Sequence, residues 1–301
     1  MVGSAIWGSL VNKGYTNLVG KTSKSLDLTN QALVNQFFAN EGIEVVIDAA
    51  ARVGGILANQ NYPYQFLMQN LQIQNNLIDA SHKFDVKKFI FLGSSCIYPK
   101  FAKQPLKEEY LLTDSLEPTN EWYAIAKIAG VKACQAIRNQ YQKDFISLMP
   151  TNLYGYEDNF DLKTSHVLPA MIRKFHEAKN NNADVVLWGS GTPMREFLFV
   201  DDLAEAVVYA LENRLQDYLY NVGTGKDITI KELAETIQKI VGHQGKIVWD
   251  DSKPDGTPRK LMDVSKMKSE GWEYSTELEE GIQLTYNWFL DNIDNVKEVK
   301  L

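Results

Sequence analysis

The feature that most constrains the fold is a regular alternation of short apolar runs with longer amphipathic segments. The runs at 44–50, 88–93 and 145–150 are apolar along almost their whole length, as in parallel strands that are buried on both faces. The segment at 63–81 carries apolar residues three and four apart, which predicts a helix. Strands that alternate with helices predict an α/β fold with a doubly wound parallel sheet and helices on both faces.

From about residue 157 the predicted elements become shorter, which indicates a second, smaller α+β domain. Its expected helices lie at 167–179, 230–241 and 278–290, and its expected strands at 184–189, 197–200, 220–222 and 246–249. We therefore expect two domains, at 1–156 and mainly at 157–301, with some later segments returning to the first. A helix at the start of the chain and a short β-like run at 17–20 complete the first domain.

Composition excludes several classes of function. The 301 residues carry a net charge of −7, and a nucleic-acid binder would instead show a basic face. The sequence has no apolar window of about 18 residues and no signal-peptide pattern, so we expect neither a membrane span nor export. Two cysteines form no disulfide framework, and too few Cys and His cluster to predict a metal site. A reducing cytoplasm is the expected location.

Tyr123 and Lys127 are four residues apart on a predicted helix, so they share one face. An ammonium beside a phenol favours the phenolate, so we expect Lys127 to lower the pKa of Tyr123 and make proton transfer possible near neutral pH. One use for that proton is the alkoxide left when a hydride reduces a ketone. Taken alone, the pair fits better a half-buried tyrosine beside a lysine whose charged end reaches solvent.

Polar stretches follow the apolar strands directly, at 49–55, 93–96 and 150–154, and a polar turn lies near Lys21. In open α/β sheets, ligands bind beyond the carboxyl ends of the strands. We therefore expect these stretches to line one crevice, together with the start of the Tyr123 helix. Ser94 is the candidate to hydrogen-bond a substrate carbonyl there. Alone it would be a strand-end cap, but Ser94, Tyr123 and Lys127 converging on one crevice form a sharper pattern.

Several motifs resemble those of the extended short-chain dehydrogenase/reductases and, more narrowly, of the GDP-L-fucose synthase family. The motifs lie at 94–99, 123–127, 150–155, 188–197 and 253–260, and the resemblance covers essentially the whole chain. The Tyr-x-x-x-Lys motif identifies only the superfamily. The segments at 94–99, 188–197 and 253–260 are similar to the narrower family.

The resemblance implies an NADP-binding Rossmann-like first domain and a second domain for a GDP-sugar. The family converts GDP-4-keto-6-deoxy-mannose to GDP-L-fucose, by epimerising C3 and C5 and then reducing the C4 ketone with NADPH. It assigns the proton exchange to Cys96 and His166, whose ordinary pKa values bracket neutral pH. It assigns proton donation during reduction to Tyr123, with Lys127 lowering the pKa of Tyr123 and holding the nicotinamide ribose. Ser94 would polarise the carbonyl.

Further residues are assigned to binding by the same resemblance. Expected cofactor contacts around the nicotinamide half are Leu92, Gly93, Ser94, Ser95, Lys127, Pro150, Thr151, Asn152, Leu153 and His166. Those nearer the amino terminus are Gly3, Lys21, Ser23, Lys24, Asp27 and Leu28. Positive charge in that turn favours NADP over NAD. Expected substrate contacts are Lys174, Trp188, Arg195 and Asp255. Without the resemblance, Trp188 would be assigned to the core and Lys174 to a solvated helix face.

The amino terminus departs from the family pattern of a first strand followed by Gly-x-x-Gly-x-x-Gly, because only Gly3 matches. The missing strand would lie mid-sheet, so we expect a truncated or misannotated reading frame that binds NADP(H) poorly and folds poorly. One alternative is another nucleotide-sugar epimerase or dehydratase, for which Cys96 would have no use. A second is a non-catalytic dinucleotide-binding module, against which the intact Ser94, Tyr123 and Lys127 argue. A homodimer is expected by analogy with the superfamily.

Overall fold

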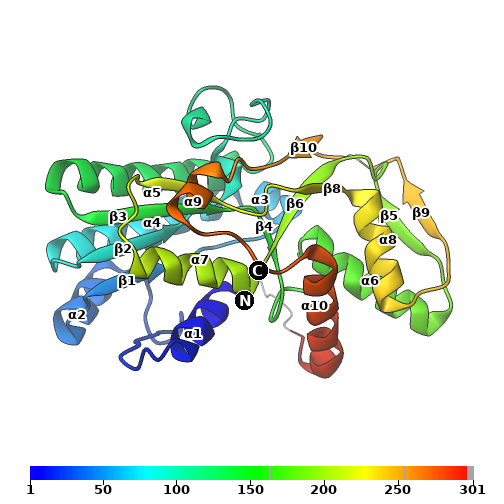
Figure 1. The fold of residues 1–301 in the computed structure, drawn as a ribbon, viewed down its shortest axis with the longest axis horizontal. Helices are drawn as coiled ribbons and strands as arrows, with labels where there is room; N and C mark the ends of the chain where they lie inside the picture. Colours follow the sequence, from blue (N-terminus) through cyan, green and yellow to red (C-terminus); the bar gives the residue numbers. More distant parts are fainter. Residues whose placement is uncertain (163, 254, 297–301) are drawn as a thin grey trace.

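A four-stranded parallel sheet forms the centre of the first half of the molecule (Figure 1). The computed structural model describes residues 1–162, 164–253 and 255–296. The strand order is β1-β2-β3-β7, and every neighbouring pair is parallel. The strands are β1 (Val45–Asp48), β2 (Lys88–Leu92), β3 (Asp144–Pro150) and β7 (Leu219–Val222). The predicted α/β class with a parallel sheet is confirmed, and β7 returns to this sheet from the second half of the chain.

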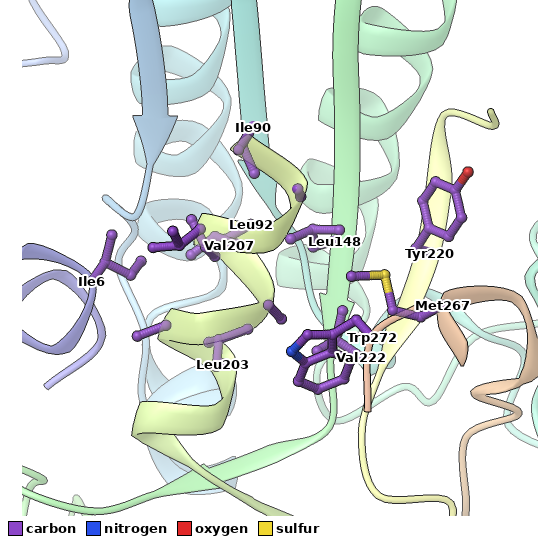
Figure 2. Packing of buried hydrophobic residues seen from close by; sticks show 14 of the residues in the cluster. Ile6, Ile90, Leu92, Leu148, Leu203, Val207, Tyr220, Val222, Met267 and Trp272 are labelled. Atoms are coloured by element: carbon purple, nitrogen blue, oxygen red, sulfur yellow. The ribbon is translucent and has the colours of Figure 1, made fainter. Parts of the chain in front are cut away.

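Helices cover both faces of the sheet. One layer holds α2 (Gln31–Glu41), α4 (Pro63–Lys83) and α5 (Glu121–Tyr141), and the other holds α1 (Val2–Asn12) and α7 (Val200–Glu212). Successive residues of β2 point to opposite faces, so Phe89 and Phe91 pack under the first layer while Ile90 and Leu92 pack against the second. Figure 2 shows Leu203 and Val207 of α7 against Ile90 and Leu92. Two covered faces explain why the strand sequences are mostly apolar.

The second half of the chain builds two small sheets and a third apolar cluster, at the right of Figure 1. One sheet joins β4 (Asn152–Tyr154), β6 (Met194–Phe199), β8 (Asp227–Thr229) and β10 (Arg259–Lys260), and β5 (Val185–Trp188) pairs with β9 (Ile247–Asp250). The helices are α6 (Val167–Asn181), α8 (Ile230–Val241) and α10 (Leu278–Asn292), with shorter α3 (Ile56–Asn61) and α9 (Ser265–Glu270) elsewhere. The domain boundary near residue 156 stays a prediction.

The strand expected at 17–20 is not formed, and this prediction is wrong. These residues are irregular and run between α1 and α2, where Gly20 lies close against the ring of Trp7. A strand needs a hydrogen-bonded neighbour, and within the described ranges β1 pairs with β2 alone. A β-like run without a partner strand has no ladder to join.

In the described part of the chain, no helix is both long and apolar enough to cross a bilayer.

Candidate active site

The turn after β2 fixes the position of Ser94. The Gly93 amide donates a hydrogen bond to the Leu148 carbonyl (2.9 Å), which keeps the backbone beside β3. A Cβ at residue 93 would lie 2.0 Å from Cε of Met149, so only glycine fits without displacing that side chain. Ser94 then caps a 3₁₀ turn, its Oγ accepting from the Cys96 amide (3.3 Å). Ser94 is partly exposed, while Ser95 is buried.

The helix α5 brings Tyr123 and Lys127 to the end of β2, as the sequence predicts. Lys127 is 2% exposed, and its Nζ donates to the Leu92 carbonyl (2.8 Å). The ammonium lies 4.6 Å from the centre of the Phe91 ring and 5.8 Å from that of Tyr123. The half-buried Tyr123 packs edge-on against Phe66, with the ring centres 6.3 Å apart. Ser94, Tyr123 and Lys127 therefore gather around the carboxyl end of one strand.

The expected lowering of the Tyr123 pKa is wrong in this structure. Burial raises the pKa of the Tyr123 phenol, and the nearby Cys96 and Asp48 raise it further. The Lys127 ammonium instead points at the Leu92 carbonyl. Burial also lowers the pKa of Lys127, although Asp48 and Cys96 oppose that shift. Tyr123 therefore keeps its proton at neutral pH, which is the form that a proton donor needs.

Cys96 lines a small open cleft, whose wall also includes Glu117, Asn120 and Lys260. Burial raises the pKa of the Cys96 thiol, and Lys260 is the first of the groups that oppose the shift. Asn120 precedes α5, and its buried Oδ1 has no hydrogen-bond partner. The cleft therefore presents the Cys96 thiol beside two polar side chains, the Asn120 amide and the Lys260 ammonium.

His166 is the residue just before α6, and its side chain makes no capping hydrogen bond. It is exposed, yet the protein atoms around it lower the pKa of its imidazole by desolvation. The chain just before it packs on the loop after β1: a Cβ at Gly55 would lie 3.4 Å from the carbonyl oxygen of Ser165. This places the start of α6 near the carboxyl end of the sheet. Within the described ranges, no hydrogen bond or ion pair joins His166 to Cys96. Their joint role stays a prediction.

Arg195 and Lys260 are register partners on β6 and β10, so two cations stand side by side. Desolvation lowers the pKa of each, and in Lys260 the neighbouring Arg195 adds to the lowering. The Arg195 guanidinium donates to the Met194 carbonyl (2.7 Å), and in the described part of the chain neither cation has an ion-pair partner. Adjacent unpaired cations form an anion site that suits a diphosphate. Sequence reasoning gave Lys260 no role, although it lies in the 253–260 motif.

The remaining expected substrate residues surround β5. Trp188 is 59% exposed, so its assignment to the core is wrong. Asp255 accepts hydrogen bonds from the Ser190 amide (2.7 Å) and hydroxyl (2.8 Å), which fastens the loop at 255 to the turn after Trp188. Lys174 is half-buried and donates to the Val186 carbonyl (3.0 Å). Pro254 of the same motif lies outside the described residues. The three side chains stay predicted substrate contacts.

The expected nicotinamide contacts at 150–153 follow β3 directly. The Thr151 amide donates to the Val222 carbonyl (3.1 Å), and the Asn152 side chain donates to the Glu196 carbonyl (2.8 Å). Pro150 and Leu153 flank these two residues at the start of the chain's passage into the second sheet. The residues around β2 and β3 fit an NADP molecule. Gly93 has no side chain to keep a ligand from the backbone, and Ser94 and Lys127 supply a hydroxyl and a buried ammonium.

The expected contacts nearer the amino terminus lie on the loop between α1 and α2. Lys21 forms an ion pair with Glu41 (4.0 Å), and the Leu28 carbonyl accepts from Asn76 of α4. Ser23 and Lys24 are exposed in a turn, Asp27 accepts from the Thr29 hydroxyl, and Gly3 lies in the first turn of α1. Within the described ranges, no hydrogen bond or ion pair links this loop to Ser94 or Tyr123. Its part in cofactor binding stays a prediction.

A parallel sheet with helices on both faces, a serine after β2, and a tyrosine and a lysine of α5 at the same edge together define a dinucleotide-dependent oxidoreductase of the short-chain type. The match to the model of the "NAD dependent epimerase/dehydratase family" spans residues 1–223, and the chain belongs to that family. Among its relatives, the putative GDP-L-fucose synthase 2 of Arabidopsis thaliana is 58% identical, with 99% of this chain and 91% of the relative covered. The GDP-L-fucose synthase of Escherichia coli strain K12 is 54% identical, with 99% and 96% covered.

A solved structure of a similar protein contains the cofactor. The GDP-L-fucose synthetase of Naegleria fowleri bound to NADP superposes with a TM-score of 0.91 at 30% identity, covering 99% of this chain and 92% of that one. The fold similarity therefore extends over both halves of the chain.

Proposed function

We propose that the chain converts GDP-4-keto-6-deoxy-mannose to GDP-L-fucose, by epimerising C3 and C5 and then reducing C4 with NADPH. The observation that carries the proposal is the position of Cys96, two residues after Ser94 and on the cleft that Lys260 lines. Ketone reduction alone needs Ser94, Tyr123 and Lys127. The Cys96 thiol, two residues after Ser94, adds a group that exchanges protons beside the ketone. The identity to GDP-L-fucose synthases over nearly the full chain supports the same reaction.

In the reduction, Ser94 Oγ donates a hydrogen bond to the C4 carbonyl oxygen and so polarises the carbonyl. NADPH, when bound, supplies the hydride. Tyr123 Oη then protonates the developing alkoxide, and its raised pKa keeps the proton available until charge develops on that oxygen. Lys127 holds positive charge beside the phenol and stabilises the phenolate that remains.

In the epimerisation, protons beside the ketone leave because the enolate is stabilised, and Ser94 stabilises it at the same oxygen. One group must remove a proton and another must return it from the opposite face. Burial favours the neutral forms of Cys96 and His166, so the thiol holds a proton to give and the imidazole can accept one. Arg195 and Lys260 bind the diphosphate, and Trp188, Lys174 and Asp255 complete the GDP-sugar site.

The test is to incubate the protein with NADPH and GDP-4-keto-6-deoxy-mannose in heavy water and to follow NADPH absorbance together with deuterium at C3 and C5. We expect NADPH oxidation and deuterium at both carbons in the product. NADPH oxidation without deuterium would contradict the proposal and leave a simple C4 reductase. Neither signal, from a chain that melts cooperatively, would favour the non-catalytic binding module.

Two variants separate the half-reactions. Tyr123→Phe should abolish NADPH oxidation and keep deuterium exchange, because it removes the proton donor alone. Cys96→Ser should lower exchange by about a hundredfold or more, since general acid–base groups contribute roughly that much. Equal loss of both signals in both variants would show that these residues support the fold rather than distinct steps.

We further propose a homodimer in the cytoplasm. Trp122 and Ile125, three residues apart on α5, and Tyr64 on α4 expose large apolar surfaces on one helical layer, which suits a second copy of the chain. Sedimentation of the protein should give a dimer, and Ile125→Lys should give a monomer. Cys96 and Cys134 are both free, in keeping with a reducing compartment. Cell fractionation tests the location.

A further inference from the structure

Asp48 is a buried carboxylate at the carboxyl end of β1. It is 2% exposed, and its Oδ1 accepts a hydrogen bond from the Ala50 amide (3.1 Å). Its Oδ2 is buried and has no hydrogen-bond partner. Buried polar atoms of native proteins nearly always have partners, so an orphaned carboxylate oxygen needs an explanation. Nothing in the roles of Ser94, Tyr123 or Cys96 uses it.

The sheet register places this carboxylate beside Lys127. Asp48 and Phe91 are paired residues of parallel neighbours, so their side chains leave the sheet on the same face, toward α4 and α5. The Lys127 ammonium lies over that same Phe91 ring, 4.6 Å from its centre. The ammonium carries three hydrogens, and the structure gives it one hydrogen bond, to Leu92. These two described residues form no direct ion pair, yet the charge of Lys127 lowers the pKa of Asp48 and so opposes the effect of burial.

We propose that Asp48 is a positioning residue, a buried counter-ion that keeps the Lys127 ammonium charged and directed at the end of β2. The titratable groups that face Lys127 are Asp48 on β1, Cys96 after β2, and Cys134 and Tyr123 on its own helix. Burial keeps the two thiols and the phenol neutral. Asp48, whose pKa burial raises to about 6, is therefore the group among these four that carries negative charge at neutral pH. The role in reduction rests on the proposed function.

The first test is a double-mutant cycle on the protein without ligands. Asp48→Asn keeps the acceptor for the Ala50 amide and removes the charge. When Lys127 is present, Asp48→Asn should lower the urea midpoint, because it removes the partner of a buried ammonium. In the Lys127→Met background it should raise the midpoint, because the buried charge of Asp48 then has no partner and its removal is favourable. The same sign in both backgrounds would overturn the proposal. Asp158→Asn is the matched control, because Asp158 is also buried with an orphaned Oδ2; its effect should be the same in both backgrounds.

The second test is the pH profile of NADPH oxidation and of deuterium exchange. Loss of a nearby negative charge lowers the pKa of a lysine, so in Asp48→Asn the alkaline limb of kcat for oxidation should move down by about one pH unit or more. Exchange at C3 and C5 should keep its rate within about twofold, which shows that the proposed function itself stands. Asp48→Glu, which keeps the charge, should restore the limb. An unshifted limb in Asp48→Asn, or no rescue by Asp48→Glu, would overturn the proposal.

Discussion

Lys87 and Lys88 are neighbours in sequence that form ion pairs of similar length but different burial. Lys87 pairs with Glu44 at 2.7 Å, and the two side chains are 71% and 66% exposed. Lys88 pairs with Asp144 at 3.1 Å, and these side chains are 9% and 16% exposed. Lys88 also donates to the carbonyls of Ala210 (2.5 Å) and Asn213 (2.7 Å), at the end of α7. Replacing each lysine by methionine therefore tests how burial changes the contribution of the same pair.

The expected magnitudes differ by several-fold. An exposed pair contributes about 0–1 kcal/mol, so Lys87→Met should lower the free energy of unfolding by less than about 1 kcal/mol. Breaking a buried pair costs about 3–5 kcal/mol, because the remaining charge stays desolvated. Asp144 keeps its second partner, Arg138 (3.1 Å), which favours the lower end of that range. The last carbonyls of α7 also lose the cation that satisfies them. We expect a loss of about 3 kcal/mol for Lys88→Met.

The assay is equilibrium urea unfolding followed by far-ultraviolet circular dichroism, with hydrogen exchange of α7 as a local measure. Lys88→Met should unfold at a clearly lower urea concentration and exchange faster in α7, while Lys87→Met should match the parent chain. Unfolding free energies of the two variants within 0.5 kcal/mol of each other would refute the reasoning. In the Lys88→Met background, Asp144→Asn should cost less than in the parent, because one of the two cationic partners of Asp144 is already gone.

Three further predictions follow from the local geometry. Gly93→Ala should destabilise the protein by about 1–3 kcal/mol through overpacking against Met149. Gly8→Ala in α1, where a Cβ meets no atom within 4 Å, should stabilise it by up to about 1 kcal/mol. Equal urea midpoints for the two variants would contradict this. Burial raises the pKa of Glu196 to about 7, so the folded state binds its proton more tightly than the unfolded state does. The free energy of unfolding should therefore fall by up to about 3 kcal/mol as the pH rises from about 4.5 to 7. In thermal melts, Glu196→Gln should make the stability depend less on pH over that range. Trp188→Ala should change stability by less than about 0.5 kcal/mol and raise KM for the GDP-sugar without raising KM for NADPH, and a change in KM for NADPH would place the ring elsewhere.

The central sheet could be predicted because a strand that is buried on both faces appears in the sequence as a run of consecutive apolar residues. After Lys88, every residue of β2 is apolar, since Phe89 and Ile90 meet different helical layers. The run at 17–20 carries a similar local pattern, but strand formation there depends on a neighbour that the pattern does not specify. Trp188 shows the same limit: β5 is apolar at every position, yet Val186 and Trp188 face outward while Val185 and Leu187 face the core. A uniformly apolar strand conceals which face is covered.

The sequence predicts which candidate residues lie close together better than it predicts their pKa values. Ser94, Tyr123 and Lys127 meet because strand ends and helix starts share one edge of the sheet, and that rule needs only the order of elements. The pairing of Arg195 with Lys260 depends on a strand register between segments far apart in the chain, which no local motif records. The direction of the Tyr123 pKa depends on burial and on Asp48, so a spacing of four residues from Lys127 could not decide it.

Burial places opposite demands on the groups of this site. It keeps Tyr123 and Cys96 protonated, which suits a phenol and a thiol that give protons, but it also disfavours the charged form of Lys127. An alkoxide or a phenolate is stabilised by a lysine only while that lysine is charged. The buried Lys127 therefore needs negative charge close to it, and Asp48 lies on the face of β1 that meets this requirement. The orphaned oxygen of Asp48 is then a consequence of the chemistry rather than a packing defect.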